Sequence, residues 1–357
     1  MTVIQSATQA ILDGKDLLPE TISGCMKEIV DGTATPVQIA GFLVGLRKKG
    51  ETVDEIAAFA SSLRGYSAMS VRPSVRGRMV DTCGTGGDAV KTPNVSTMSS
   101  FVAAGAGAVV AKHGGRSVTS KSGSADVMER LGFNLSMETS RVKDSIEQLG
   151  IGFMFAPSFH PAMKQVAPVR KELGVRTVFN LMGPLINPAR VDAQLVGLYS
   201  PALVSQVAQV LGKLGVQEAM VVHGQEGVDE ISVTGKTLLS HLKDGKTETR
   251  EYLPREFGVP NRPLEPTSTP ADAEEGAMLV LSLLGGDRDE ADSDLWMVLV
   301  NSAACLVLAQ KASNFAEGVE MASSSIKSGR AMAKLEQVVN FSGGSLDGAR
   351  ERYGRKK

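Results

Sequence analysis

The sequence predicts an α/β fold with a small N-terminal helical domain and a larger α/β domain, in which helices flank a mostly parallel central sheet. Two observations support this prediction. Residues 1–72 carry helical patterns with no strand signal, whereas from Met79 onward short apolar runs alternate with glycine-rich turns and amphipathic segments. Continuous apolar strands that alternate with helices are typical of a parallel sheet covered on both faces.

Two helix starts in the N-terminal part follow the capping-box pattern. Thr35 precedes Pro36 and has Gln38 three positions later, and Thr52 has Glu55 at the same spacing. The N-cap hydroxyl and the side chain three residues later each bind a backbone N–H group that the start of a helix leaves free. We therefore expect two capped helices that form an αα-hairpin.

The larger domain is expected to contain five buried strands and an antiparallel hairpin. The strand candidates are residues 80–83, 108–111, 151–155, 195–198 and 219–222, and the hairpin spans 237–252 with its turn near Asp244-Gly245. Helices are expected near 271–284, 293–310, 315–325 and 331–339. The proline-bounded segment 168–188 is expected to return to the helical domain, which would place a cleft between the domains.

The expected domain boundaries follow from this pattern. The helical domain would comprise residues 1–72 joined by part of 168–188, and the α/β domain residues 73–167 and 189–345. Residues 346–357 form a basic C-terminal tail, which we expect to be a solvated end.

Composition excludes several classes of function. The chain of 357 residues is 42% apolar and 22% charged, as expected for a globular protein. A net charge of −1 and only 4% aromatic residues argue against nucleic acid as a partner. The longest apolar stretch, residues 295–309, is too short for a membrane span. Three widely spaced cysteines and the lack of a signal-peptide pattern indicate a cytoplasmic protein.

The glycine-rich segment 81–88 is the most informative motif. Gly84, Gly86 and Gly87 let the backbone turn tightly and point N–H groups at an anion, between a strand and a helix start. Asp88 would repel a phosphate unless a cation lay between them, which suggests Mg²⁺. The alternative is a plain turn between a strand and a helix.

A second polar loop, residues 112–126, follows the next strand and carries cations, hydroxyls and glycines. Because such loops meet at the carboxyl edge of a parallel sheet, two of them suggest a ligand with two phosphate groups. The alternative for this segment is a solvated loop in which Ser124 caps the next helix. Asn94 and Ser96, which follow the glycine-rich segment, can face the same ligand, and the alternative for them is ordinary N-capping of a helix.

Adjacent carboxylates at Asp229 and Glu230 form a weaker signal. Neighbouring residues on a strand point to opposite faces, so both can reach one metal only where the strand ends or bends. A surface Asp-Glu pair is the alternative. No set of nucleophile, base and acid can be recognised in the sequence.

Taken in order, these segments resemble the anthranilate phosphoribosyltransferase family. The likeness runs from Thr35 to about Val233 and includes 81–88, 94–97, 112–126, 155–163, 168–177, 180–188 and 229–230. It implies Mg²⁺-dependent transfer of the 5-phosphoribosyl group from phosphoribosyl pyrophosphate (PRPP) to the amine of anthranilate in tryptophan biosynthesis. It also implies two Mg²⁺ ions per site and a cytoplasmic homodimer that pairs through the helical domain.

The resemblance further implies roles for single residues, none of which acts as a catalytic acid or base. PRPP would be bound by Gly84, Thr85, Gly86, Gly87, Asp88, Thr92, Asn94, Ser96, Thr97, Lys112 and Ser124. Anthranilate would be bound by Gly84, His113, Gly115, His160, Arg170 and Gly183. Magnesium would be bound by Ser96, Asp229 and Glu230.

One position departs from the family pattern, which has Asn where this chain has Gly115. Glycine supplies no amide, so one hydrogen bond to the acceptor would be lost at a cost of about 0.5–1.5 kcal/mol. This departure leaves open a phosphoribosyltransferase with a different aromatic acceptor. A pyrimidine nucleoside phosphorylase and a non-catalytic relative that binds nucleic acid also stay open as functions of this chain.

Overall fold

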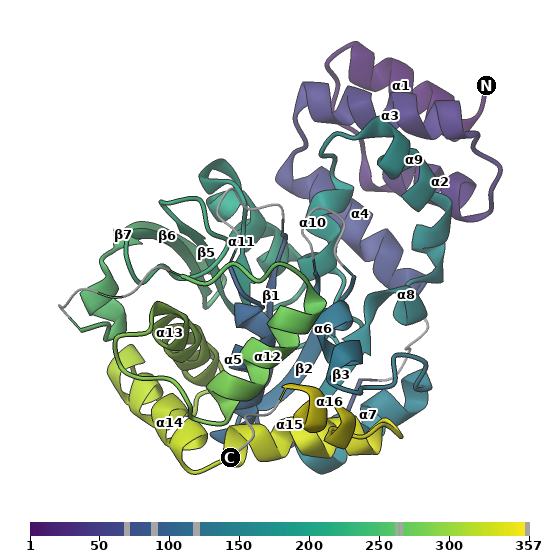
Figure 1. Cartoon of the computed structure of the whole chain (residues 1–357). Coiled ribbons are helices and arrows are strands. Elements are labelled where there is room, and N and C mark those ends of the chain that lie inside the picture. Colours follow the sequence, from purple (N-terminus) through teal and green to yellow (C-terminus); the bar gives the residue numbers. More distant parts are fainter. Residues whose placement is uncertain (68–71, 87–91, 117–121, 261–263, 265–266, 354–357) are drawn as a thin grey trace.

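A seven-stranded sheet forms the centre of the larger domain, and the N-terminal helices form a separate lobe (Figure 1). The computed structural model describes residues 1–357 except 68–71, 87–91, 117–121, 261–263, 265–266 and 354–357. The strands are β1 (Met79–Gly84), β2 (Val109–Gly114), β3 (Ile151–Phe155), β4 (Ala193–Gly197), β5 (Glu218–Gly224), β6 (Thr237–Lys243) and β7 (Lys246–Tyr252). They lie in the order β3-β2-β1-β4-β5-β6-β7.

The first five strands of this order are parallel, and β6 and β7 add an antiparallel hairpin at one edge. The predicted turn of the hairpin is confirmed, because Asp244 and Gly245 both have positive φ, at 50° and 73°. Such backbone suits a two-residue turn whose twist matches the flanking strands. The predicted α/β fold class with a mostly parallel sheet is confirmed.

The helical lobe comprises α1 (Val3–Leu12), α2 (Pro19–Val30), α3 (Pro36–Lys49) and α4 (Val53–Gly65). Both predicted capping boxes are present. The Thr35 hydroxyl accepts from the Gln38 N–H, and the Thr52 hydroxyl accepts from the Glu55 N–H. Within the described residues, no helix is long and apolar enough to span a membrane.

Short helices after β3 connect the lobe to the sheet. These are α8 (Ala156–Phe159), the 3₁₀ helix η1 (Pro161–Gln165), α9 (Ala167–Leu173) and α10 (Phe179–Leu185). η1 packs on α2 and α9 packs on α3, whereas α10 contacts α4, β1 and β2. The segment therefore touches both parts of the molecule, and α10 lies at the seam (Figure 1).

The remaining helices cover the sheet. They are α5 (Val95–Gly105), α6 (Ser124–Arg130), α7 (Thr139–Leu149), the 3₁₀ helices η2 (Pro201–Leu203) and η3 (Pro254–Phe257), α11 (Val204–Lys213), α12 (Ala273–Leu284), α13 (Ser293–Leu308), α14 (Phe315–Lys327), α15 (Arg330–Phe341) and α16 (Asp347–Tyr353). α5 and α13 pack on one face of the sheet, and α11 packs on β5 and β6 from the lobe side.

Alternation along the strands divides the core in two. On β4 and β5, Leu195 and Met220 join the core under α5 and α13, while their neighbours Val196 and Val221 join the core shared with the helical lobe. Neighbouring strand residues point to opposite faces, so one sheet supports both cores. Because the second core contains residues of both the sheet and the helical lobe, it holds the carboxyl edge of the parallel strands next to the lobe.

Candidate active site

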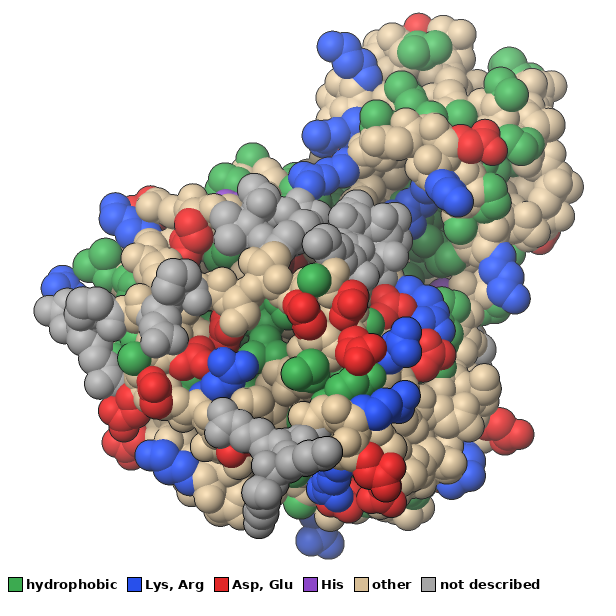
Figure 2. All heavy atoms as spheres, in the orientation of Figure 1, with side chains coloured by type: hydrophobic (Ala, Val, Ile, Leu, Met, Phe, Trp, Pro, Cys, Tyr) green, Lys and Arg blue, Asp and Glu red, His purple; other side chains and the backbone are tan. Residues whose placement is uncertain are grey.

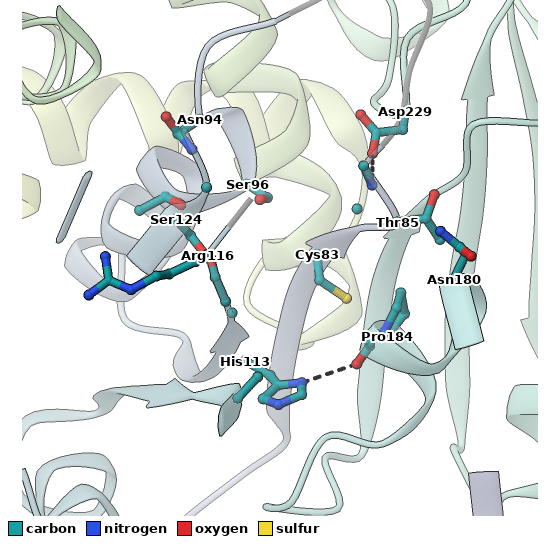
Figure 3. A pocket seen from close by; sticks show the side chains of 18 of the residues that line it. Cys83, Thr85, Asn94, Ser96, His113, Arg116, Ser124, Asn180, Pro184 and Asp229 are labelled. Carbon is teal, nitrogen blue, oxygen red and sulfur yellow. Dashed lines mark hydrogen bonds between the residues drawn. The ribbon is translucent and has the colours of Figure 1, made fainter. Parts of the chain in front are cut away.

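A cavity of about 950 Å³ lies between the carboxyl edge of the sheet and the seam helices (Figure 3). Its walls come from the loops after β1, β2 and β5, from the start of α5, and from α8 to α10. Ligands of open parallel sheets bind at this edge. The cavity therefore has the position expected for an active site.

The glycine-rich loop and the acidic loop touch each other at one end of the cavity. The Gly86 N–H donates to Asp229 Oδ2 at 2.9 Å, and Gly86 has a positive φ of 64°. A Cβ at Gly84 would lie 2.3 Å from Asp229 Oδ2, and a Cβ at Gly197 would lie 1.5 Å from the Asp229 carbonyl oxygen. Glycine at positions 84 and 197 is therefore what lets the carboxylate reach the loop.

Lys112 brings a buried cation to the same end. Its side chain is 3% exposed, and Nζ donates to the Thr82 carbonyl at 2.7 Å and to Ser96 Oγ at 3.2 Å. The lysine thus ties the end of β2 to β1 and to the first turn of α5. Among the described residues no carboxylate is hydrogen-bonded to this buried ammonium, so it is suited to an incoming anion.

Asp81 lies beneath the cavity, where it orders the strands. Its carboxylate accepts from the His113 N–H at 3.2 Å and from Asn187 Nδ2 at 2.8 Å. Burial raises the pKa of Asp81, while the Lys112 charge and these hydrogen bonds oppose the increase. The group links three segments and is too deep to line the cavity, so its role is structural.

The acidic loop after β5 is held by its own hydroxyls. Asp229 and Glu230 are each 6% exposed and both line the cavity. Ser232 Oγ and Thr234 Oγ1 donate to Glu226, and the Ile231 N–H donates to Asn301 Oδ1 at 3.2 Å. These bonds fix the backbone just beyond the two carboxylates. In the described residues no cluster of three His, Cys, Asp or Glu side chains is arranged to hold a metal.

The opposite end of the cavity holds two histidines in contact. The rings of His113 and His160 meet edge to face, with centroids 5.1 Å apart. Burial lowers the pKa of His113 to about 3 and the pKa of His160 to about 4, with further contributions from nearby positive charge. Both imidazoles are therefore neutral at pH 7.

The tautomer of His113 follows from its partner. Its Nδ1 lies 3.0 Å from the Gly183 carbonyl oxygen, which can only accept, so Nδ1 carries the proton (Figure 3). Nε2 is then a hydrogen-bond acceptor. Among the described residues Nε2 has no hydrogen-bond partner, whereas the His160 ring interacts with the Ile186 backbone, which partly offsets the lowering of the His160 pKa by burial. This end of the cavity is thus backed by neutral imidazoles whose ring nitrogens are buried.

Arg170 adds a cation to this end. It lines the cavity from α9, with its guanidinium carbon 5.8 Å from the centroid of the Phe179 ring. Burial lowers the pKa of Arg170. Within the described part of the chain no carboxylate forms an ion pair with it. A planar guanidinium that is buried and has no ion pair among the described residues is suited to a carboxylate ligand.

The last turn of α10 is anchored from three sides. The carbonyl of Gly183 bonds to His113 on β2, that of Pro184 to Gln194 on β4, and that of Leu185 to Arg64 on α4. Helix ends leave such carbonyls without partners inside the helix. Here side chains from both domains satisfy them, so the wall of the acceptor end is a fixed part of the seam.

Every predicted site residue that the structure describes lines this one cavity. These are Gly84, Thr85, Gly86, Thr92, Asn94, Ser96, Thr97, Lys112, His113, Gly115, Ser124, His160, Arg170, Gly183, Asp229 and Glu230. Gly87 and Asp88 lie outside the described residues. The roles of all these residues remain predictions, because proximity alone does not assign them.

The capping alternatives for this region are not supported. Asn94 is the N-cap residue of α5 but makes no hydrogen bond of a capping kind with its side chain, and Ser96 lies inside the helix. The N-cap of α6 is Gly123, with Ser124 as the first helical residue. The side chains of Asn94 and Ser124 are thus not needed as caps, and both line the cavity.

Sequence reasoning missed several lining residues. Met163, Asn180, Pro184, Thr269 and Pro270 also border the cavity. Asn180 lies within segment 168–188, which the sequence predicted to border a cleft. Its polar side chain could therefore have been proposed as a lining residue. Residues 269 and 270 precede a C-terminal helix and carry no pattern that predicts their position.

Comparisons with known proteins agree with the two-domain architecture. The glycosyl transferase family, helical bundle domain, matches residues 5–67, and the glycosyl transferase family, a/b domain, matches residues 76–332. The second match spans more than half of the chain. The fold and the cavity thus define a glycosyl transferase with a helical domain and an α/β domain.

Individual relatives narrow this class. The anthranilate phosphoribosyltransferase of Thiobacillus denitrificans is 47% identical over 350 residues, covering 96% of this chain and 98% of that protein. The crystal structure of the Thermus thermophilus enzyme matches with a TM-score of 0.86 and 40% identity, covering 94% and 99% of the two chains. The chain belongs to the anthranilate phosphoribosyltransferase family, which confirms the resemblance, and it is a pentosyltransferase.

The Saccharomyces cerevisiae enzyme is also similar in structure. Its complex with PRPP and Mg matches with a TM-score of 0.83 and 29% identity, covering 95% of this chain and 98% of that chain. Its complex with 4-fluoroanthranilate matches equally well, at 27% identity. The similarity therefore extends across both domains of the chain.

Proposed function

We propose that this chain transfers the 5-phosphoribosyl group of PRPP to the amine of anthranilate and releases pyrophosphate, as a step of tryptophan biosynthesis. One observation carries the proposal. A single cavity joins an end suited to phosphate, with Lys112 and the glycine-rich loop, to an end where Arg170 lies near neutral imidazoles. The complexes of the yeast relative with PRPP and with 4-fluoroanthranilate support the same two ligands.

The pyrophosphate of PRPP would lie at the sheet end. The Lys112 ammonium would bind its oxygens, and the polar side chains at 92–97 and Ser124 would bind the remainder of PRPP. The Gly86 N–H, which donates to Asp229 in the structure, would join them by exchanging that carboxylate for a pyrophosphate oxygen. Fixed donors in a buried site stabilise charge that develops on a leaving group more than water does. PRPP binding by Gly87 and Asp88 remains part of the proposal.

Magnesium fits the acidic residues of this end. Asp229 and Glu230 are adjacent, buried and next to the glycine-rich loop. Mg²⁺ usually takes one or two carboxylates together with phosphate oxygens and water, so a cage of three protein ligands is not required. When bound, it would neutralise charge on the pyrophosphate. We propose two ions per site, with Ser96 as a further ligand.

Anthranilate would occupy the other end. Its carboxylate would pair with Arg170, and its ring would pack near His160 and Gly183. Because Nδ1 of His113 donates to a carbonyl, Nε2 is an acceptor, and since this atom is buried, the ring would have to shift for Nε2 to accept from the amine. This arrangement would direct the nitrogen toward the sugar.

The reaction would be a displacement at C1 of the ribose. The nitrogen–C1 bond forms as the bond from C1 to pyrophosphate oxygen breaks, and the electron pair leaves with pyrophosphate. The nitrogen then loses a proton to water, because an aniline nitrogen is strongly acidic once it has bonded to carbon. Much of the rate would come from holding two substrates in line in one cavity.

The test is a steady-state assay with PRPP, Mg²⁺ and anthranilate that follows the loss of anthranilate fluorescence. We expect turnover that depends on all three. Absence of turnover despite measurable PRPP binding would reject anthranilate as the acceptor. Phosphorolysis of thymidine by the same preparation would instead favour a nucleoside phosphorylase.

We also propose a cytoplasmic homodimer that pairs through a helical domain of residues 1–72 joined by part of 168–188. Exposed apolar side chains support the pairing surface, namely Val3, Leu12, Leu18, Val37 and Val44. Apolar side chains are visible across this lobe in Figure 2. The described cysteines are free and buried, which suits a reducing compartment. Light scattering should give about twice the chain mass of 37.6 kDa.

A further inference from the structure

A second cavity lies where the helical lobe meets the sheet domain, on residues that do not line the active site. Its volume is about 410 Å³, and it lies among the last turn of α4, the segment after α10 and the end of α11. Four cationic side chains, Arg64, Arg72, Arg190 and Lys213, line it together with one carboxylate, Asp192. We call it the junction cavity.

Two of these cations already have acidic partners. Arg72 pairs with Asp192, whose carboxylate also accepts the Met79 N–H at 2.9 Å. Lys213 pairs with Asp54 at 2.7 Å, and both of these side chains are largely exposed. The charge that is left without compensation therefore lies on the other two arginines.

Arg64 is bonded only to neutral groups. Its Nε donates to the Leu185 carbonyl at 2.8 Å and its Nη1 to the Leu214 carbonyl at 3.1 Å. Burial, with a smaller contribution from the charge of Arg190, lowers the pKa of Arg64 to about 10. The guanidinium stays charged at pH 7, next to a second positive group, with no carboxylate paired to it within the described residues.

Arg190 is unusual in both its side chain and its backbone. It is exposed to the cavity, and in the described part of the chain it makes no ion pair or side-chain hydrogen bond. Its φ is +50°, a conformation that glycine or asparagine adopts at lower cost. A costly backbone conformation beside an uncompensated charge is a reason to look for a function.

We propose that the junction cavity binds a phosphate-class oxyanion between Arg64 of the helical lobe and Arg190 of the sheet domain. Guanidinium groups recognise such anions through paired, charge-assisted hydrogen bonds. The cavity is large enough for inorganic phosphate, for pyrophosphate or for the phosphate end of a small metabolite. The anion would bridge the two domains at their seam.

A bound oxyanion would also act on the acceptor end of the active site. Arg64 holds the Leu185 carbonyl of α10, and the two preceding residues of α10 line the active-site cavity. An anion that immobilises Arg64 would therefore immobilise this wall. We expect phosphate to raise the melting temperature and to change the affinity for the acceptor, because the two sites share α10.

Calorimetric titration with inorganic phosphate, at saturating PRPP and Mg²⁺, tests the proposal. Wild type should bind one phosphate per protomer at this site, and Arg190→Gln should bind it about 10- to 100-fold more weakly. Arg190→Lys should retain part of the affinity. The matched control is Arg255→Gln, which removes an exposed arginine from η3 and should titrate as wild type.

Arg190→Gly provides a variant whose backbone is compatible with the positive φ, so loss of binding in it could not be ascribed to misfolding. Equal phosphate binding in wild type and both neutral variants would overturn the proposal. The readout is binding, so it does not depend on turnover. A failure of the proposed enzyme activity would leave the difference between wild type and Arg190→Gln intact. Repeating the titration with pyrophosphate would show which oxyanion the cavity prefers.

Discussion

The two ends of the active-site cavity are built in different ways. The sheet end consists of glycines and carboxylates on the loops that leave β1 and β5, together with the Lys112 ammonium at the end of β2. The other end combines side chains of the seam segment 156–186 with His113 of β2, and there His113 and His160 are buried and neutral. One end is organised by charge, and the other by burial.

This difference separates binding tasks that demand different environments. Pyrophosphate carries several charges and needs fixed donors and cations, which loops at a sheet edge supply. An aromatic amine needs an apolar wall with a few polar groups that orient it. Substitutions at the sheet end should therefore abolish the reaction, whereas those at the seam should change acceptor affinity and stability.

The largest effect is expected from removing both acidic side chains of the β5 loop. Asp229→Asn with Glu230→Gln removes the only adjacent carboxylates that line the cavity among the described residues. We expect kcat to fall by about 10³-fold or more at any Mg²⁺ concentration, because charge on the leaving pyrophosphate would not be neutralised. The assay is steady-state turnover across a range of Mg²⁺ concentrations.

The matched control is Asp289→Asn with Glu290→Gln, an adjacent acidic pair that does not line the cavity. This variant should keep wild-type turnover. Near-normal turnover in the variant of the β5 loop would mean that magnesium, if used at all, is held elsewhere.

A smaller effect is expected at the seam. Arg170→Gln removes the guanidinium proposed to pair with the anthranilate carboxylate and should lower kcat/KM for anthranilate by about 10²-fold. Arg170→Lys keeps the charge without the planar fork and should lose about tenfold. The KM for PRPP should stay within about twofold, since Arg170 lies at the opposite end. Equal losses for both substrates would contradict the division of the cavity.

The sheet end was largely predictable from sequence, and the seam was not. Segments 81–88 and 112–126 could be recognised because tight turns need glycine and anion sites need cations. Each segment also begins at the end of a strand. The seam depends on contacts between distant residues, such as Gln194 with Pro184 and Arg64 with Leu185. Nothing local in the sequence records such pairs, nor the burial that neutralises the histidines.

Acid should weaken the seam through these histidines. Their pKa values in the folded chain, about 3 and 4, lie below the ordinary value of 6.5, so below pH 6.5 the unfolded chain binds more protons. Stability should therefore fall as pH drops from 6.5 toward 4, by about 1.4 kcal/mol per pH unit for each histidine. At pH 5 the loss is about 2 kcal/mol for each.

Urea unfolding of wild type and His160→Phe between pH 5 and 7 measures this loss. Phenylalanine keeps a ring against His113 and removes the proton site, together with the interaction of the imidazole with the Ile186 backbone. The variant should lose about 2 kcal/mol less than wild type over this range. Subtracting the two profiles removes contributions from other buried groups such as Asp81. Parallel profiles would show that His160 does not titrate as described.

The smallest effect is expected at Gly115, where the family pattern has Asn. Among the described residues, a Cβ at this position would meet only the Ala156 Cβ, at 3.8 Å, and the φ of Gly115 is not in the left-handed region. Gly115→Asn should therefore fold normally and, by restoring one hydrogen bond to anthranilate, lower its KM about two- to tenfold. Gly115→Ala tests the space alone and should leave KM unchanged. If asparagine raises KM while alanine does not, the seam has been rebuilt around glycine, and its acceptor contacts differ from those of the family.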